Sequence, residues 1–403
     1  MIGSGMDRLL KALFQLREFK LKRDDDFTDR LNRQWTPTLM ALFTILVSIK
    51  QYVGAPISCW CPAQFTPSHH DYTNTVCWVS DTYYVPFSRT APKEKEPRED
   101  ISYYQWVPIL LLVQATMFCL PAVLWKLLHR RCGLNVCSLI EASRAAQRAL
   151  YADTREKTTR FVVAQIDCYL LQQRDYSRSG FAKLRATFAR YCCLFPARLH
   201  GNYLTTVYLC SKFAYLINST GQLFLLDFFL GGGYSVYGLR LLRNAMKGGR
   251  RWSASPIFPR VTLCDFQVRQ QTNVHRYTVQ CVLPINLFNE KIFIFIWFWL
   301  VMVSCCTLIS LLQCTYKASY WPAQVRDVRK TLSSLEFGKR EIRTAKTFVE
   351  RYLRRDGMLL LRLITVNAGH LVSADVLRGL WVGYGSDKRI QNKSRANLSQ
   401  EMV

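Results

Sequence analysis

The sequence predicts an all-α membrane protein with four transmembrane helices, a cytoplasmic helical domain and a small disulfide-linked extracellular α/β loop region. Three observations lead to this prediction. Half of the 403 residues are hydrophobic, and they gather in four runs close to the about 20 residues that cross a bilayer as a helix. The segments between these runs are polar and strongly basic. Cysteines occur in pairs in the two segments that four spans would place on one side of the membrane.

The four predicted spans differ in how apolar they are. They cover residues 35–53, 107–128, 203–230 and 292–313. The third is the least clean because it holds Lys212, Asn218 and Asp227, and such side chains inside a bundle face protein or water rather than lipid. Residues 1–34 contain a short amphipathic stretch but no apolar core ahead of a cleavage site. We therefore expect the first span to act as an uncleaved insertion signal.

The connecting segments predict the rest of the fold. Two loops, 54–106 and 231–291, carry the paired cysteines, and alternating polarity at 260–263 and 277–280 predicts short strands. Basic residues are frequent in 129–202 and in the tail 314–403. Apolar spacing predicts helices in both, with an amphipathic block at 348–384 and then a polar, disordered end. The acidic run Asp24-Asp25-Asp26 is expected to cap the next helix or to stay solvated.

Charge and cysteine chemistry together predict that both termini are cytoplasmic. Segment 129–202 and the tail are basic, as cytoplasmic segments are, but so is 231–291, and long loops follow this rule poorly. The cysteines therefore decide the orientation, because disulfides persist outside the cell. The loop cysteines are Cys59, Cys61, Cys77, Cys264 and Cys281. In each loop the two outermost are spaced as for a strand, a turn and a strand. Their number is odd, so one is spare, and the other cysteines of the chain are expected to be free thiols.

The composition also argues against other classes of protein. A net charge of +26 would suggest nucleic-acid binding in a soluble protein, but basic flanks of membrane spans and anionic lipid account for it here. We expect membrane lipids and no nucleic acid as partners. His69-His70 lies in a loop without a nearby carboxylate pattern, which gives no catalytic or metal site. Gly231-Gly232-Gly233 lacks the following Lys-Ser/Thr of a phosphate loop. No enzyme activity and no cofactor are expected.

A specific motif stands where the second span begins: Tyr103-Tyr104-Gln105-Trp106-Val107. Its physical chemistry alone indicates an aromatic anchor at the headgroups. As a sequence it resembles the signature of the innexins, the invertebrate gap-junction channel proteins. The likeness continues at 56–65, 75–79, 82–86, 258–266, 279–283, 286–293, 295–299, 355–357 and 359–362. Residues 24–27 and 29–32 resemble the nematode branch of the family.

The resemblance implies two disulfides that tie the two loops together. The matching cysteines are Cys59 and Cys77 in the first loop and Cys264 and Cys281 in the second. Nested pairing gives Cys59–Cys281 and Cys77–Cys264, although spacing alone does not choose among the connectivities. Cys61 is additional to the family's pattern and stands two residues from Cys59, where it competes for a partner.

The resemblance also implies a subunit of an oligomeric channel. Eight subunits would surround a pore to form a hemichannel, and hemichannels of two adjacent cells would dock through the loops in a gap junction of the plasma membrane. Ions and small molecules would pass. A helix within 1–34 would line the pore, and Lys50 and Gln51 would form its outer wall. The residues of that helix expected to face the pore are Met6, Asp7, Arg8 and Lys11.

Other functions are compatible with the same sequence. A non-junctional hemichannel would release small metabolites, and a regulatory subunit would act only in heteromeric channels with other innexins. A four-span receptor or adhesion protein would also use disulfide-bonded loops, but it would need no pore-sized oligomer. A membrane enzyme would need catalytic side chains that converge at one membrane face.

Overall fold

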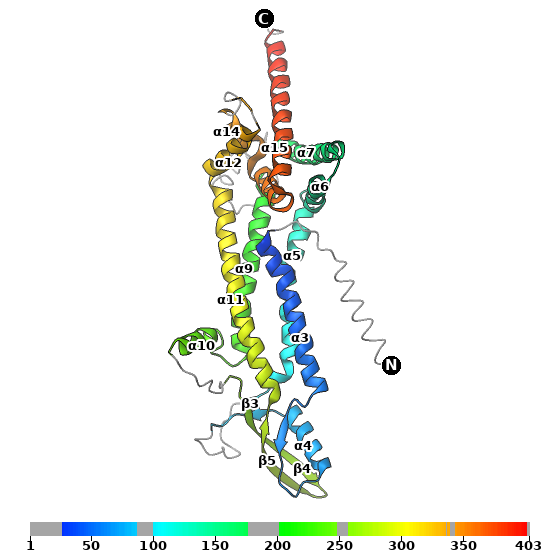
Figure 1. The fold of residues 1–403 in the computed structure, drawn as a ribbon, viewed down its shortest axis with the longest axis vertical. Helices are drawn as coiled ribbons and strands as arrows, with labels where there is room; N and C mark the ends of the chain where they lie inside the picture. Colours follow the sequence, from blue (N-terminus) through cyan, green and yellow to red (C-terminus); the bar gives the residue numbers. More distant parts are fainter. Residues whose placement is uncertain are drawn as a thin grey trace. The chain divides into compact units, whose positions relative to one another are not determined.

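The computed structural model describes residues 26–86, 100–175, 201–247, 257–335, 337–338 and 343–400. They divide into two compact units (Figure 1). The first, which we call the sheet unit, comprises Leu31–Leu120 and Tyr215–Thr307. The second, the helical unit, comprises the described part of Met1–Arg30 with Pro121–Ala214 and Leu308–Val403. Three long helices contribute residues to both units: α5 (Tyr103–Arg130), α9 (Tyr203–Phe229) and α11 (Pro284–Ser319).

The first described helix contains a π-helical turn. The elements α2 (Phe27–Arg30), η1 (Leu31–Trp35) and α3 (Thr36–Val53) follow one another without a break. Pro37 explains the irregular turn, because proline has no backbone N–H and its ring clashes with the carbonyl four residues earlier. The Thr36 hydroxyl donates a hydrogen bond of 2.9 Å to the carbonyl of Leu31, which keeps that carbonyl satisfied.

The long helices carry apolar side chains on their exposed faces. In α3, Leu42, Ile45 and Ile49 are about half exposed, whereas Met40 and Val47 on the opposite face are buried. Within the described residues, four helices are long and apolar enough to cross a membrane: Phe27–Val53, Tyr103–Arg130, Pro284–Ser319 and Ala345–Gly385. A bilayer supplies the apolar surroundings that such faces need. The predicted fold class is confirmed in these helices together with a small disulfide-bonded strand region.

One of these four helices is not a predicted span. Ala345–Gly385 lies in the tail, whereas the predicted third span forms α9, whose polar residues lower its mean hydropathy. The tail segment is not one straight helix, because α15 (Arg354–Gln400) is interrupted at Gly369, where φ is 83° and ψ is 168°. Its apolar side chains are the core of the helical unit, and Leu360 and Ile364 are fully buried there. A packed protein core therefore accounts for its apolar composition.

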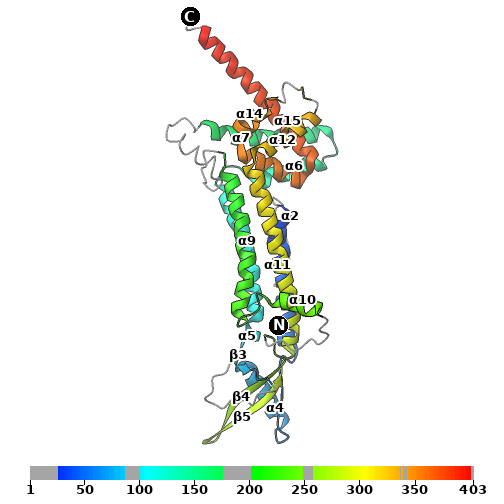
Figure 2. The same cartoon turned by 90° about the vertical axis from the view of Figure 1, so that its left-hand side faces the viewer.

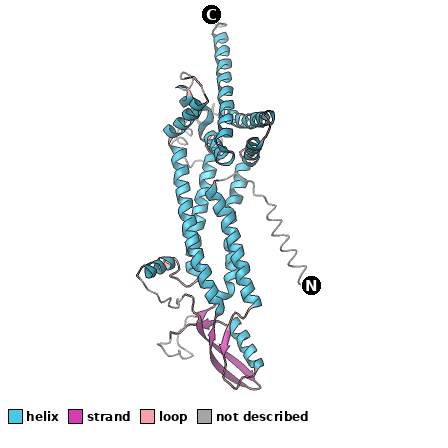
Figure 3. Cartoon of the chain, viewed as in Figure 1, coloured by secondary structure: helices cyan, strands magenta, loops and turns pink. Residues whose placement is uncertain are grey.

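A five-stranded antiparallel sheet joins two distant parts of the sequence (Figure 3). Its strands are β1 (Ser58–Trp60), β2 (Thr82–Tyr83), β3 (Asp100–Ile101), β4 (Val261–Gln270) and β5 (Asn273–Val282), in the spatial order β1-β5-β4-β2-β3. Strands β4 and β5 form a hairpin, and they include residues 261–263 and 277–280 of the two stretches in which alternating polarity predicts a strand. Cys264 and Phe266 of β4 point to the buried side, as a period of two requires.

Helix α4 (Pro67–Val79) replaces a predicted strand. The spacing of Cys59 and Cys77 predicts a strand, a turn and a strand, but a strand and a helix connect them instead. Thr66 caps this helix: its hydroxyl accepts a hydrogen bond from the backbone N–H of His69, and the His69 ring accepts one from the N–H of Thr66. Proline at the first helical position is already in helical geometry. Thr66-Pro67 is thus a helix start that the cysteine spacing obscured.

The helical unit forms around one apolar core, and Figure 2 shows its helices from the side. Its remaining elements are α6 (Val136–Arg148), α7 (Ala152–Asp175), α12 (Trp321–Ser334), α14 (Ala345–Thr347) and η3 (Phe348–Leu353). They lie in the two segments for which apolar spacing predicts helices. The tail differs from expectation at its end, because α15 continues to Gln400 where the polar composition predicts disorder. Extending an existing helix costs less free energy than nucleating one, so polar composition alone does not predict where α15 ends.

Asp356 fastens the beginning of α9 to the tail. Its carboxylate is fully buried and accepts hydrogen bonds from the backbone N–H groups of Leu204 (3.3 Å) and Thr205 (2.9 Å). It also accepts from the Thr205 hydroxyl at 2.9 Å and from the Tyr169 hydroxyl at 3.1 Å. The first N–H groups of a helix have no partner within the helix, so Asp356 does the work of a capping side chain from a distant segment.

We predict that Asp356→Ala lowers the melting temperature of the detergent-solubilised protein by about 5 °C or more. Buried donors left without an acceptor cost about 1–3 kcal/mol each. The matched control is Asp375→Ala: Asp375 pairs with Arg155 at 2.7 Å, but both side chains are about 40% exposed, where a pair contributes little. Thermal unfolding of both variants tests this, and shifts of equal size would contradict it.

Candidate functional site

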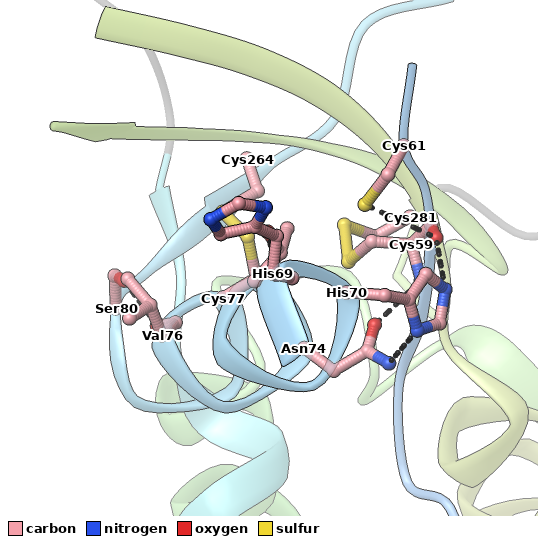
Figure 4. Close-up of a disulfide and its surroundings, with 11 residues drawn as sticks. Cys59, Cys61, His69, His70, Asn74, Val76, Cys77, Ser80, Cys264 and Cys281 are labelled. Atoms are coloured by element: carbon pink, nitrogen blue, oxygen red, sulfur yellow. Dashed lines mark hydrogen bonds between the residues drawn. A yellow bond between two sulfur atoms is a disulfide. The ribbon is translucent and has the colours of Figure 1, made fainter. Parts of the chain in front are cut away.

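Two disulfides lie side by side in the sheet unit (Figure 4). Cys59 of β1 is bonded to Cys281, its direct partner in β5, and Cys77 of α4 is bonded to Cys264 of β4. The sulfur atoms of Cys59, Cys77 and Cys281 lie within 4.8 Å of one another, and because all three are in disulfides they offer no thiolate to a metal. The pairing is the nested one. It leaves Cys61 as a free thiol, whose sulfur lies 3.9 Å from the carbonyl oxygen of Cys59.

Side chains of α4 cover the outer edge of the sheet. Strand β1 is at one end of the strand order, so one side of its backbone lacks a neighbouring strand. Asn74 accepts a hydrogen bond from the N–H of Cys59 at 2.9 Å, and the His70 ring lies 3.1 Å from the carbonyl of Cys59 (Figure 4). Asn74 and His70 also contact each other at 3.2 Å. These contacts block the edge against pairing with another strand. Sequence analysis placed His70 in a loop without a catalytic or metal site and missed this role in α4.

Four of the five signature residues hold the start of α5 in place within the sheet unit. The Tyr103 hydroxyl donates to the carbonyl of Ile257 at 2.9 Å, and the Gln105 side-chain amide donates to the carbonyl of Trp78 at 2.6 Å, at the end of α4. Tyr104 is fully buried, with its ring centroid 5.0 Å from that of Trp78, and Val107 is fully buried as well. Only Trp106 is open, at 55% exposure. The expectation of an aromatic anchor at the headgroups therefore fits Trp106, whereas the buried Tyr104 has a packing role.

The residues predicted to line a pore fall in two places. Four of them lie outside the described residues: Met6, Asp7, Arg8 and Lys11. Lys50 is half-buried near the end of α3, and its ammonium nitrogen lies 5.4 Å from the centre of the Phe288 ring, a cation–π contact. Gln51 is buried, and its amide donates to the carbonyl of Gln105 at 3.3 Å. The role of Lys50 and Gln51 in the pore wall stays a prediction. It fits Lys50 better, because that side chain is more exposed than Gln51.

A cluster of buried charges holds the segment before α3 within the helical unit. Lys212 of α9 is 1% exposed, and its ammonium lies 2.9 Å from a carboxylate oxygen of Asp29 and 3.4 Å from one of Asp26. Asp29 also accepts a hydrogen bond of 2.8 Å from the Tyr208 hydroxyl, and Asp26 lies 3.5 Å from Arg362. Lys212 was expected to face protein or water, and it faces protein. Asp26, expected to cap a helix or stay solvated, is instead buried and paired.

These features define a class of protein: a multi-span membrane protein whose two disulfide-bonded loops form one small sheet. The comparisons with known proteins identify the family. The innexin family model matches residues 25–384. The chain is 39% identical to innexin unc-9 of Caenorhabditis elegans over 368 residues, 91% of this chain and 93% of that protein. It is 39% identical to innexin-3 of the same organism, over 92% and 86% of the two chains, and 34% identical to innexin-19 of Caenorhabditis briggsae, over 90% and 87%. The chain belongs to the innexin family, whose members form gap-junction channels.

We predict that the buried charges of Lys212 and Asp29 are strongly coupled. Lys212→Met leaves the buried carboxylate of Asp29 without its cation, and Asp29→Asn removes that carboxylate from the lysine, so each change alone should lower the melting temperature markedly. Breaking a buried pair costs about 3–5 kcal/mol, whereas removing both charges together often costs much less. In the double variant Asp26 keeps its contact with Arg362.

The measurement is thermal unfolding of the two single variants and the double variant in detergent. We expect the double variant to lose less melting temperature than the two single variants lose in sum, and to melt at a higher temperature than the less stable single variant. Strictly additive shifts would show that the two side chains do not depend on each other.

Proposed function

We propose that this chain is a subunit of an oligomeric hemichannel that docks with a hemichannel of an adjacent cell and passes ions and small molecules. The observation that carries the proposal is the sheet of two distant loops, locked by two disulfides, in a chain of the innexin family. Such a preformed surface lowers the ordering cost of binding, because its loops do not have to be immobilised when they meet a partner. An octameric ring is the arrangement that the resemblance implies.

Connectivity supports α9 as the third span. The disulfides join residues 222 and 187 positions apart, and both ends of each must be on the same side of the membrane. The chain between Cys77 and Cys264 therefore crosses an even number of times. The helix α5 crosses once, so one more crossing is needed before Cys264. Of the two other long helices in between, α7 begins with a highly charged stretch, so the more apolar α9 is the one available. With spans at 35–53, 107–128, 203–230 and 292–313, the loops face outward at the plasma membrane and both termini are cytoplasmic.

The docking surface in this proposal is the sheet region. Trp60 is 75% exposed, Tyr72 is 51% exposed and Val274, beside the β4–β5 turn, is 53% exposed. Large apolar side chains that stay exposed on a rigid frame are typical of protein interfaces. Because α4 covers the edge of β1, docking would use side-chain surfaces rather than the addition of a strand. In the same proposal, residues of 1–34 line the pore and Lys50 lies at its outer wall.

Two narrower functions use the same architecture. A non-junctional hemichannel would release small metabolites through an undocked pore, and a regulatory subunit would work only in heteromeric channels with other innexins. The rigid, apolar sheet surface favours docking over the first. The family membership is compatible with homomeric and heteromeric rings.

The test is electrical coupling between paired cells that each express this chain alone. We predict coupling for the unchanged protein, and a loss of about tenfold or more in Cys77→Ser and Cys264→Ser, because each frees α4 from β4. Cys61→Ser is the matched control, since Cys61 is a free thiol in the same loop, and it should couple normally.

Surface delivery is measured in parallel by labelling with a membrane-impermeant reagent. Coupling that persists in Cys264→Ser would contradict a docking surface that depends on the disulfides. An unchanged protein that reaches the surface as rings but never couples would replace docking with one of the two narrower functions.

A further inference from the structure

A short amphipathic helix in the second loop has no role in the sheet. The helix α10 (Tyr237–Met246) belongs to the sheet unit and stands apart from the strands (Figures 1 and 2). One side of it exposes large apolar side chains: Leu239 is 58% exposed, Leu242 49% and Met246 74%. These positions are three and four residues apart, so they lie on one face of the helix. In water such a face is unfavourable.

The start of α10 is anchored to α11 in the first turns of a membrane span. The Tyr234 hydroxyl donates to the carbonyl of Phe293 at 2.7 Å, and the Trp297 indole donates to the carbonyl of Ser235 at 2.9 Å. Gly238 lies so close to the Trp297 ring that a side-chain carbon there would approach it to 2.1 Å. Because the predicted span begins at residue 292, these contacts place α10 at the boundary between headgroups and hydrocarbon.

Basic side chains lie next to the apolar face. Arg240, Arg243 and Lys247 repeat with the same spacing as Leu239, Leu242 and Met246, and all are exposed. None of the three makes an ion pair with another described residue, and the sequence from 228 to 264 contains no Asp or Glu. A helix with exposed Leu and Met on one side and Arg and Lys beside them matches a phospholipid surface, since acyl chains meet the first and phosphates the second.

We propose that α10 is an interfacial helix that lies in the outer leaflet, with Leu239, Leu242 and Met246 among the acyl chains and Arg240, Arg243 and Lys247 at the lipid phosphates. Large apolar side chains are also exposed near the end of α9, where Phe224 is 68% and Phe228 88% exposed. In this position α10 fixes the height of the sheet region above the bilayer through its contacts with Trp297 and Phe293. The proposal rests on the spans and the outward orientation of the loops in the proposed function, but it does not depend on docking.

The test uses the full chain in phosphatidylcholine nanodiscs with a photoreactive p-benzoylphenylalanine at Leu242 or at Met246. The matched control places the same residue at Asn244, which is exposed on the polar side of α10. After illumination, peptide mass spectrometry measures phosphatidylcholine adducts on α10. We expect adducts at both apolar positions in at least about fivefold excess over the control position, because only that face reaches the acyl chains.

Two results would overturn the proposal. Chain-to-chain cross-links at Leu242 and Met246 would show that a second copy covers this face, and adduct levels equal to those at Asn244 would show that lipid does not contact it. The unsubstituted protein gives a second measurement that does not depend on variant folding. A phosphatidylcholine with a diazirine in its acyl chain should label the peptide that contains α10, and absence of that label would also refute the proposal.

Discussion

The two disulfides are the constraint on which the rest of the structure depends. They bond β1 to β5 and α4 to β4, which brings together loops that are separated by two membrane-length helices in the sequence. A covalent bond between the loops requires the intervening chain to cross a membrane an even number of times. It also holds short strands that would be unstable alone, since β1, β2 and β3 have only two or three residues each. Around this frame, His70 and Asn74 contact the backbone groups that β1 leaves open at Cys59, and Gln105 donates to the Trp78 carbonyl at the end of α4.

Different interactions stabilise the helical unit. No disulfide occurs among its described cysteines, and its polar fastenings are buried charges and a buried cap. Lys212 holds Asp26 and Asp29 at the start of the first long helix, and Asp356 holds the start of α9. Each of these contacts is strong because water is excluded from it, and each links segments far apart in the sequence. The helical unit therefore relies on satisfied polar groups where the sheet unit relies on covalent bonds.

Much of the architecture could be predicted from the sequence, because apolar length and alternating polarity reflect simple geometry. Such patterns predicted three of the spans and the strands of the β4–β5 hairpin. The family resemblance supplied the nested cysteine pairing as one of the possible connectivities. Cysteine spacing did not reveal α4, whose start was encoded in Thr66-Pro67. Hydropathy alone does not separate a membrane span from a packed core, because Ala345–Gly385 reaches the hydropathy of a span, but amphipathic spacing correctly predicted a helix of the tail there. Tyr104 and Asp26 were misjudged because a residue's burial depends on partners that pattern analysis does not supply, here Trp78 and Lys212.

The measurement that tests this account most directly is disulfide mapping of the protein isolated from the cell surface. Free thiols are blocked, the protein is digested without reduction, and linked peptides are identified by mass spectrometry, with Cys61→Ser used to separate the two neighbouring cysteines of the first loop. The account predicts peptides that link Cys59 to Cys281 and Cys77 to Cys264. A link between Cys59 and Cys77, within one loop, would contradict it, because the two loops would then be free of each other and the argument for the third span would lose its basis.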